Sequence, residues 1–182
     1  MLVDTGADDL GPKTGKLFQN LRAEGISPSD IDVVVLTHAH PDHIGGNTSK
    51  DGKLAFPNAR FFIWKDEFDF WISEKAEQKL NQHSKELLLT LARKNLQPIQ
   101  DQLNLIDQEI EILPGIRAVA APGHTPGHMA LAISSKRENN GGGRRSAGKR
   151  CRLTNCHEIE NHELSFKCPD CVNPQGSKSN LF

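Results

Sequence analysis

Hydrophobic residues fall in short runs along the first 135 positions, and turn-forming residues separate these runs. Residues 33–36 are a β-branched run without polar alternation, which is typical of a strand buried on both faces. Further strands are expected at residues 2–3, 60–64, 109–113, 116–121 and 129–133. The pattern therefore predicts several short strands, at least one of which lies inside a sheet.

Apolar positions also recur at helical spacing in two segments. In residues 13–23, Leu17 and Leu21 lie one turn apart, and Gly25 follows at a position where helices commonly end. Residues 66–95 are mostly helical in pattern. Their apolar positions are Phe70, Trp71, Leu80, Leu87, Leu88 and Leu91. Because strands alternate with helices, we expect an α/β fold with layered sheets.

The composition changes near Ser135. Residues 136–152 contain an Asn-Asn-Gly-Gly-Gly run and seven basic residues, which is linker composition. The remaining residues are short and polar, and could not build a core alone. We therefore expect a folded domain at residues 1–135 and a basic linker with a disordered cysteine-containing tail at residues 136–182.

Charge and size limit the classes of function. The chain has 182 residues, and residues 1–135 hold 13 basic and 18 acidic side chains, so a nucleic-acid partner is not expected for this domain. No apolar run approaches the roughly 20 residues of a membrane span, and the start lacks a secretory signal pattern. We therefore expect a cytoplasmic protein without a membrane partner.

Histidines gather in two loops. His38, His40, Asp42 and His43 directly follow the buried strand, and His124 and His128 lie in a second Pro-Gly-rich loop. Imidazole and carboxylate groups are good ligands for zinc and similar ions. Scattered surface or core histidines and a closed structural zinc site are the alternatives. The clustering disfavours the first. Structural zinc sites are usually rich in cysteine, and residues 1–135 contain none, which disfavours the second.

Three motifs in order resemble those of the metallo-β-lactamase superfamily of metal-dependent hydrolases. They are Asp4-Thr5-Gly6, the loop THAHPDHIGG and the loop PGHTPGH, and the resemblance covers about residues 2–134. The segments Phe61-Phe62-Ile63-Trp64 and Asp69-Phe70-Trp71 further resemble the lactonase and organophosphate-hydrolase branch. The resemblance implies an αββα sandwich with its site at one edge.

The resemblance also implies roles for individual residues. His38, His40 and His124 would hold one metal, and Asp42 and His43 would help to hold a second. Asp4 would lie under the first loop and orient it by hydrogen bonds, whereas His128 would brace its own loop. The expected cofactor is zinc, as one or two ions, with other divalent metals as alternatives.

The implied activity is hydrolysis by a metal-activated hydroxide, with Asp42 as a participant in proton transfer. The substrate would be a small molecule: a lactone, ester, thioester or phosphotriester. Residues 66–95 could form a wall of its pocket, but the core face of ordinary helices is the favoured interpretation. The sequence does not decide whether the protein forms an oligomer.

The chain also departs from the family pattern. The family supplies a bridging aspartate and a last histidine beyond the second loop, and neither is recognisable here. Met1 lies almost on the Asp-Thr-Gly motif, so the chain looks truncated at both ends and the sandwich partial. The alternative function is therefore a catalytically inactive fragment that binds metal or a partner.

Four cysteines lie in the tail. Cys151, Cys156, Cys168 and Cys171 could together hold one zinc ion in a small basic module that contacts nucleic acid or an acidic partner. The favoured alternative is a disordered tail whose cysteine spacing is coincidental, because few apolar residues accompany them.

Overall fold

The structure is a computed structural model that describes residues 1–82, 85–134 and 152–153. Its first sheet is parallel throughout, in the order β1-β2-β3-β4. The strands are β1 (Leu2–Val3), β2 (Val33–Val35), β3 (Arg60–Trp64) and β4 (Leu103–Ile106). All three residues of β2 are buried, as its uninterrupted β-branched run predicts.

The second sheet is antiparallel, in the order β5-β6-β7-β8. Its strands are β5 (Glu111–Leu113), β6 (Ile116–Ala120), β7 (Met129–Ile133) and β8 (Arg152–Leu153). β5 and β6 form a hairpin through Pro114 and Gly115, and Gly115 has a positive φ of 79°. Glycine adopts this left-handed conformation without steric cost, so the turn is encoded locally.

The helices pack against one face of the parallel sheet. They are α1 (Leu17–Ala23), α2 (Pro41–Ile44), α3 (Lys65–Ile72), α4 (Glu74–Lys79), α6 (Thr90–Leu96) and a π-helical segment at Lys85–Leu89. Short 3-10 turns occupy Pro28–Asp30, Gly45–Asn47 and Gln97–Gln102. The segment expected to be helical at 66–95 is therefore helical in several pieces rather than continuous.

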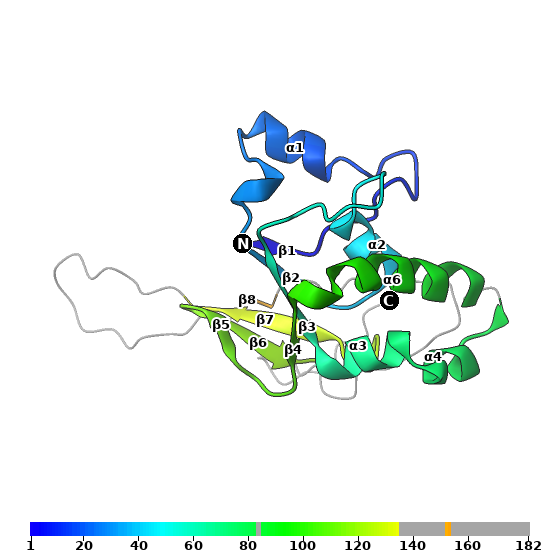
Figure 1. The fold of residues 1–182 in the computed structure, drawn as a ribbon. Helices are drawn as coiled ribbons and strands as arrows, with labels where there is room; N and C mark the ends of the chain where they lie inside the picture. Colours follow the sequence, from blue (N-terminus) through cyan, green and yellow to red (C-terminus); the bar gives the residue numbers. More distant parts are fainter. Residues whose placement is uncertain (83–84, 135–151, 154–182) are drawn as a thin grey trace, which may run out of the picture.

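Two hydrophobic cores lie on opposite faces of the parallel sheet, because successive side chains of a strand point to opposite faces. Val34, Phe61 and Ile63 face the helices, whose apolar residues join this core. Val33 and Val35 of β2, with Phe62 and Trp64 of β3, face the antiparallel sheet. Figure 1 shows α1, α2 and α6 on one side of the parallel sheet and β5–β7 on the other. The described residues thus form one helical layer and two sheets, which confirms the expected partial sandwich.

β4 was not expected from the sequence. Leu103 and Leu105 alternate with Asn104, but Leu105 is exposed and the segment lies between polar turns. An edge strand with only one paired neighbour carries a weak pattern. Leu87, expected as an apolar helix position, is 49% exposed and does not belong to the core.

The predicted linker and tail lie largely outside the described residues, and so do Cys151, Cys156, Cys168 and Cys171. Within that segment, Arg152 and Leu153 form β8, which pairs with the end of β7. In the part of the chain that the structure describes, no helix is long and apolar enough to cross a membrane.

Candidate metal centre

The two histidine loops meet where the two sheets join. The first histidine loop (residues 37–43) follows β2, and the second histidine loop (residues 121–128) leads into β7. The backbone N–H of Met129 donates to the carbonyl of Thr37 at 2.9 Å, so the start of β7 is bonded to the end of β2. Residues 84 or more positions apart in the chain are thereby brought together.

A single helical turn, α2, shapes the first histidine loop. Pro41 lies at its first position, where a missing N–H leaves no intrahelical bond unmade. The N–H groups of His43 and Ile44 donate to the carbonyl of His40 at 2.9 and 3.2 Å. Asp42 and His43 therefore lie on the turn, while His38 and His40 lie on the extended segment before it.

Three imidazoles converge at this junction. His38, His40 and His124 each offer a ligand nitrogen, and these atoms all lie within 4.8 Å of one another. His40 Nδ1 and His124 Nε2 are 3.0 Å apart. Nitrogens bound to one tetrahedral zinc, each about 2.0–2.1 Å from the metal, lie roughly 3.4 Å apart. The three rings could therefore hold a single ion after small shifts.

A chain of hydrogen bonds fixes the orientation of His38. The Asp4 carboxylate accepts from the Thr37 N–H at 2.7 Å and from the Thr37 hydroxyl at 2.8 Å. Because that hydroxyl donates to Asp4, it accepts from His38 Nδ1, which is 3.0 Å away. His38 Nε2 then carries the lone pair. It is buried without a hydrogen-bond partner among the described residues, as expected of a metal ligand.

The same carboxylate orients His43. Its Nδ1 donates to Asp4 at 2.8 Å, and its Nε2 lies 3.4 Å from the Asp42 carboxylate. Burial alone would lower the pKa of His43, but the hydrogen bond and charge of Asp4, with the charge of Asp42, raise it above its ordinary value. Among the described residues this pair lacks the further ligands that a second metal would need.

Burial keeps the other histidines neutral. It lowers the pKa of His40 to about 4 and the pKa of His38 far below its ordinary value, and neighbouring imidazoles add to both effects. The pKa values of His124 and His128 are also lowered, chiefly by burial. Metals bind neutral imidazole, so these rings are in the coordinating form at neutral pH.

His128 is buried and bonded within its own loop. Its Nδ1 donates to the Ala121 carbonyl at 3.1 Å, and the Ala121 N–H donates to the His128 carbonyl at 2.9 Å. These two bonds close the second histidine loop at its ends. The loop-bracing role of His128 stays a prediction, which these two bonds support.

Sequence reasoning did not single out two residues that contact the histidine loops. Thr37 links Asp4 to His38, and its only signal is its place as the first residue of the THAHPDHIGG motif, directly before His38. Glu67, on α3, accepts hydrogen bonds from Ala39 and Gly127 at 2.9 and 3.0 Å. An acidic residue on an otherwise apolar helix face was the available signal.

The helices after β3 contribute mainly to the core. Trp71 and Leu80 are buried in the helix-side core, and Phe70 packs against it. This agrees with the favoured interpretation of residues 66–95. Trp71 also reaches the site, because its ring lies edge-on to His40 with centroids 5.5 Å apart.

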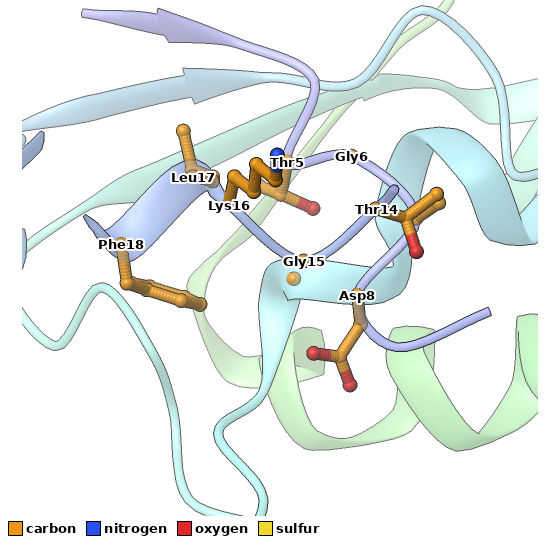
Figure 2. Close-up of a pocket in the computed structure, with 10 residues that line it drawn as sticks. Thr5, Gly6, Asp8, Thr14, Gly15, Lys16, Leu17 and Phe18 are labelled. Carbon is orange, nitrogen blue, oxygen red and sulfur yellow. The ribbon is translucent and has the colours of Figure 1, made fainter. Parts of the chain in front are cut away.

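A hollow of about 200 Å³ lies beside the Asp-Thr-Gly motif. Figure 2 shows it between that motif and the start of α1. Its lining includes Thr5, Gly6, Gly15, Lys16, Phe18 and Gly46. None of the clustered histidines lines it, so it is separate from the candidate metal centre.

Comparison with known proteins gives one family match and several relatives. Residues 1–138 match the family described as the metallo-beta-lactamase superfamily. An N-acyl homoserine lactonase from a Bacillus species is 31% identical over 122 residues, which are 67% of this chain and 40% of that protein.

Solved structures give the same fold. A dizinc quorum-quenching lactonase, AidC, is 38% identical with a TM-score of 0.66 over 75% of this chain and 49% of its own. The hydrolase AbOPH of the beta-lactamase superfamily is 30% identical with a TM-score of 0.67 over the same shares. The chain thus spans half or less of the length of these three proteins.

Proposed function

Because the chain belongs to the metallo-beta-lactamase superfamily, we propose that it is a metal-dependent hydrolase of a small lactone. The proposed ligands of its metal are His38, His40 and His124, and zinc is the proposed ion. Relatives named as N-acyl homoserine lactonases support the lactone, and a similar structure described as dizinc supports the metal.

The observation that carries the proposal is the environment of His38, whose ring nitrogen is available to bind a metal. Its Nε2 is buried and lacks a hydrogen-bond partner among the described residues, and His38 belongs to the cluster whose ligand nitrogens lie within 4.8 Å of one another. Leaving a buried acceptor unsatisfied costs about 1–3 kcal/mol. A bound metal ion would remove this penalty, because the nitrogen would then be coordinated.

The remaining residues of the site would control orientation and protons. A divalent metal held there would supply Lewis-acid polarisation of the carbonyl and activation of water near neutral pH. Asp42 is 43% exposed at the side chain, so its carboxylate can accept a proton from solvent-derived water and release it. Asp4 would hold His38 and His43 in their tautomers throughout.

The activity is tested with an N-acyl homoserine lactone. Addition of water across the ring C–O bond yields an N-acyl homoserine carboxylate and releases one proton, so mass and acid release both report the reaction. We expect turnover by the zinc-loaded chain that is lost in His124→Ala. Thr90→Ala, at an exposed position of α6, is the control.

One other outcome is favoured by a specific observation, the incomplete ligand set around Asp42 and His43. Zinc binding without turnover of any lactone would identify the chain as a metal-binding but non-catalytic member of the family. Absence of zinc binding would contradict both functions.

A further inference from the structure

Glu67 is a fully buried carboxylate that contacts both histidine loops. Its Oε1 accepts from the N–H of Ala39, between His38 and His40, at 2.9 Å. Its Oε2 accepts from the N–H of Gly127, in the second histidine loop, at 3.0 Å. One side chain on α3 therefore bonds the backbone of two loops that are far apart in sequence.

The close packing of Gly127 on α3 is independent of these hydrogen bonds. A Cβ atom at position 127 would lie 2.1 Å from the backbone nitrogen of Glu67 and 2.6 Å from its Cα. Backbone atoms cannot move aside as a flexible side chain can. Only glycine therefore allows the second histidine loop to approach α3 closely enough to reach the carboxylate.

Trp71 adds a third contact. Its indole Nε1 donates to Glu67 Oε1 at 2.7 Å from one helical turn further along α3. The same indole ring lies edge-on to the imidazole of His40. Glu67 is therefore connected to His40 in two ways, by its hydrogen bond to the adjacent backbone N–H of Ala39 and by its hydrogen bond to Trp71, whose ring contacts His40.

The charge of Glu67 is compensated by donors. None of the ion pairs among the described residues includes it, and it receives three N–H bonds instead. It also lies in the first turn of α3, where the helix dipole stabilises a negative charge. A carboxylate is an acceptor at both oxygens, so it can satisfy donors from both loops, whereas an amide can satisfy only one side.

From these contacts we propose that Glu67 is a positioning residue that fixes the distance between the two histidine loops, and with it the spacing of His40 and His124. The inference rests on the proposed metal centre for its functional meaning. The hydrogen bonds of Glu67 to Ala39 and Gly127, which we call the clamp, do not require a bound metal.

The test compares three variants in the full chain with all four cysteines changed to serine. Glu67→Gln is nearly isosteric but places an NH₂ group against a backbone N–H, so it breaks the clamp on one side. Trp71→Phe removes the indole donor together with part of the buried ring that packs in the helix-side core and against His40. Ile99→Val, in the helix-side core, is a control for lost stability, because Ile99 is fully buried and takes no part in these contacts.

Hydrogen exchange without metal is the first readout. We expect Glu67→Gln to accelerate exchange at Ala39 and Gly127 at least tenfold, and Ile99→Val to leave the ratio of these rates to the core rates unchanged. Equal acceleration everywhere in Glu67→Gln would overturn the proposal, because it would indicate only a general loss of stability.

Cobalt binding is the second readout, measured well below the melting temperature. We expect Glu67→Gln to weaken affinity about tenfold and to alter the visible spectrum, Trp71→Phe to do so less, and Ile99→Val to do neither. Wild-type affinity and spectrum in Glu67→Gln would refute the proposal. If the parent chain bound no cobalt, the proposed function would fail while the exchange experiment still decided whether the clamp exists.

Discussion

At the scale of single residues, Asp4 orients the imidazoles of both His38 and His43 through hydrogen bonds. It accepts from Thr37 and His43, and it does so with a positive φ of 54°. Asn tolerates this backbone conformation, so Asp4→Asn changes the hydrogen bonds without adding strain. We expect a loss of about 1–3 kcal/mol in the free energy of unfolding and about 10–100-fold in zinc affinity.

Asp8→Asn is the matched control for this substitution. Asp8 also has a positive φ, of 45°, but none of the hydrogen bonds that join the histidine loops includes it. Denaturant unfolding and zinc titration of both variants measure the difference. Equal effects of the two substitutions would contradict the orienting role of Asp4.

The histidines predict how the metal-free protein responds to pH. The folded-state pKa values of His38 and His40 lie below the unfolded value of about 6.5. As the pH falls below 6.5, these histidines become protonated in the unfolded chain but stay neutral in the folded chain. The free energy of unfolding therefore decreases until the pH reaches the folded pKa, which is about 4 for His40. His38 alone would contribute up to about 1.4 kcal/mol per pH unit.

His43 acts in the opposite direction and in a different range. Its folded pKa is raised, so its contribution is complete below 6.5 and is lost only as the pH rises through the folded value. It therefore does not offset the loss in acid. Urea unfolding in the presence of a chelator, at pH 7 and pH 5, measures the effect. Equal stability at the two values would show that the buried rings take up protons without unfolding.

The roles that the sequence did not predict belong to residues whose contacts join segments far apart in the chain. The histidines and Asp4 stand in recognisable motifs, so their proximity was predicted. Thr37 and Glu67 act through contacts that span 33 and up to 60 positions. The Thr37 contact follows from the parallel pairing of β1 with β2, and the Glu67 contacts follow from the packing of α3 against both loops. No local sequence pattern encodes either arrangement.

At the scale of elements, Arg93 fastens α6 to the end of α3. Its guanidinium donates to the carbonyls of Trp71 and Ser73 at 3.2 Å each, and it pairs with Glu77 at 2.7 Å. Because lysine lacks the planar fork, Arg93→Lys loses the bonds to the helix end but keeps the charge. We expect unfolding to require about 1–2 kcal/mol less, measured by urea titration, with the exposed neighbour Lys94→Ala close to wild type. An Arg93→Lys chain as stable as wild type would mean that the charge pair with Glu77 on α4, and not the bonds to the end of α3, accounts for the contribution of Arg93.

Elements with a strong pattern were predicted with nearly their observed bounds. β3 and β7 coincide with the expected strands, since both carry runs of apolar residues. α1 begins only at Leu17, because the preceding residues include Gly15, which has a positive φ of 72°. β4 was not predicted, because its hydrogen-bonded pairing with β3, and not the hydrophobic pattern of its own residues, makes it a strand.

At the scale of the whole molecule, the candidate metal centre joins the two sheets. His38 and His40 follow β2 of the parallel sheet, whereas His124 precedes β7 of the antiparallel sheet. An ion held by all three would link the layers and stabilise the folded chain. At a free concentration one hundred times the dissociation constant, the gain is about 2.7 kcal/mol.

Zinc titration of the full chain, with its four cysteines changed to serine, tests the central claim most directly. A chromophoric chelator in competition reports the affinity, and a melting curve on the same samples reports the stabilisation. We predict tight binding at His38, His40 and His124, with a rise in melting temperature, both lost in His124→Ala and kept in Thr90→Ala. Zinc binding that survives in His124→Ala, or none in the parent chain, would contradict the account.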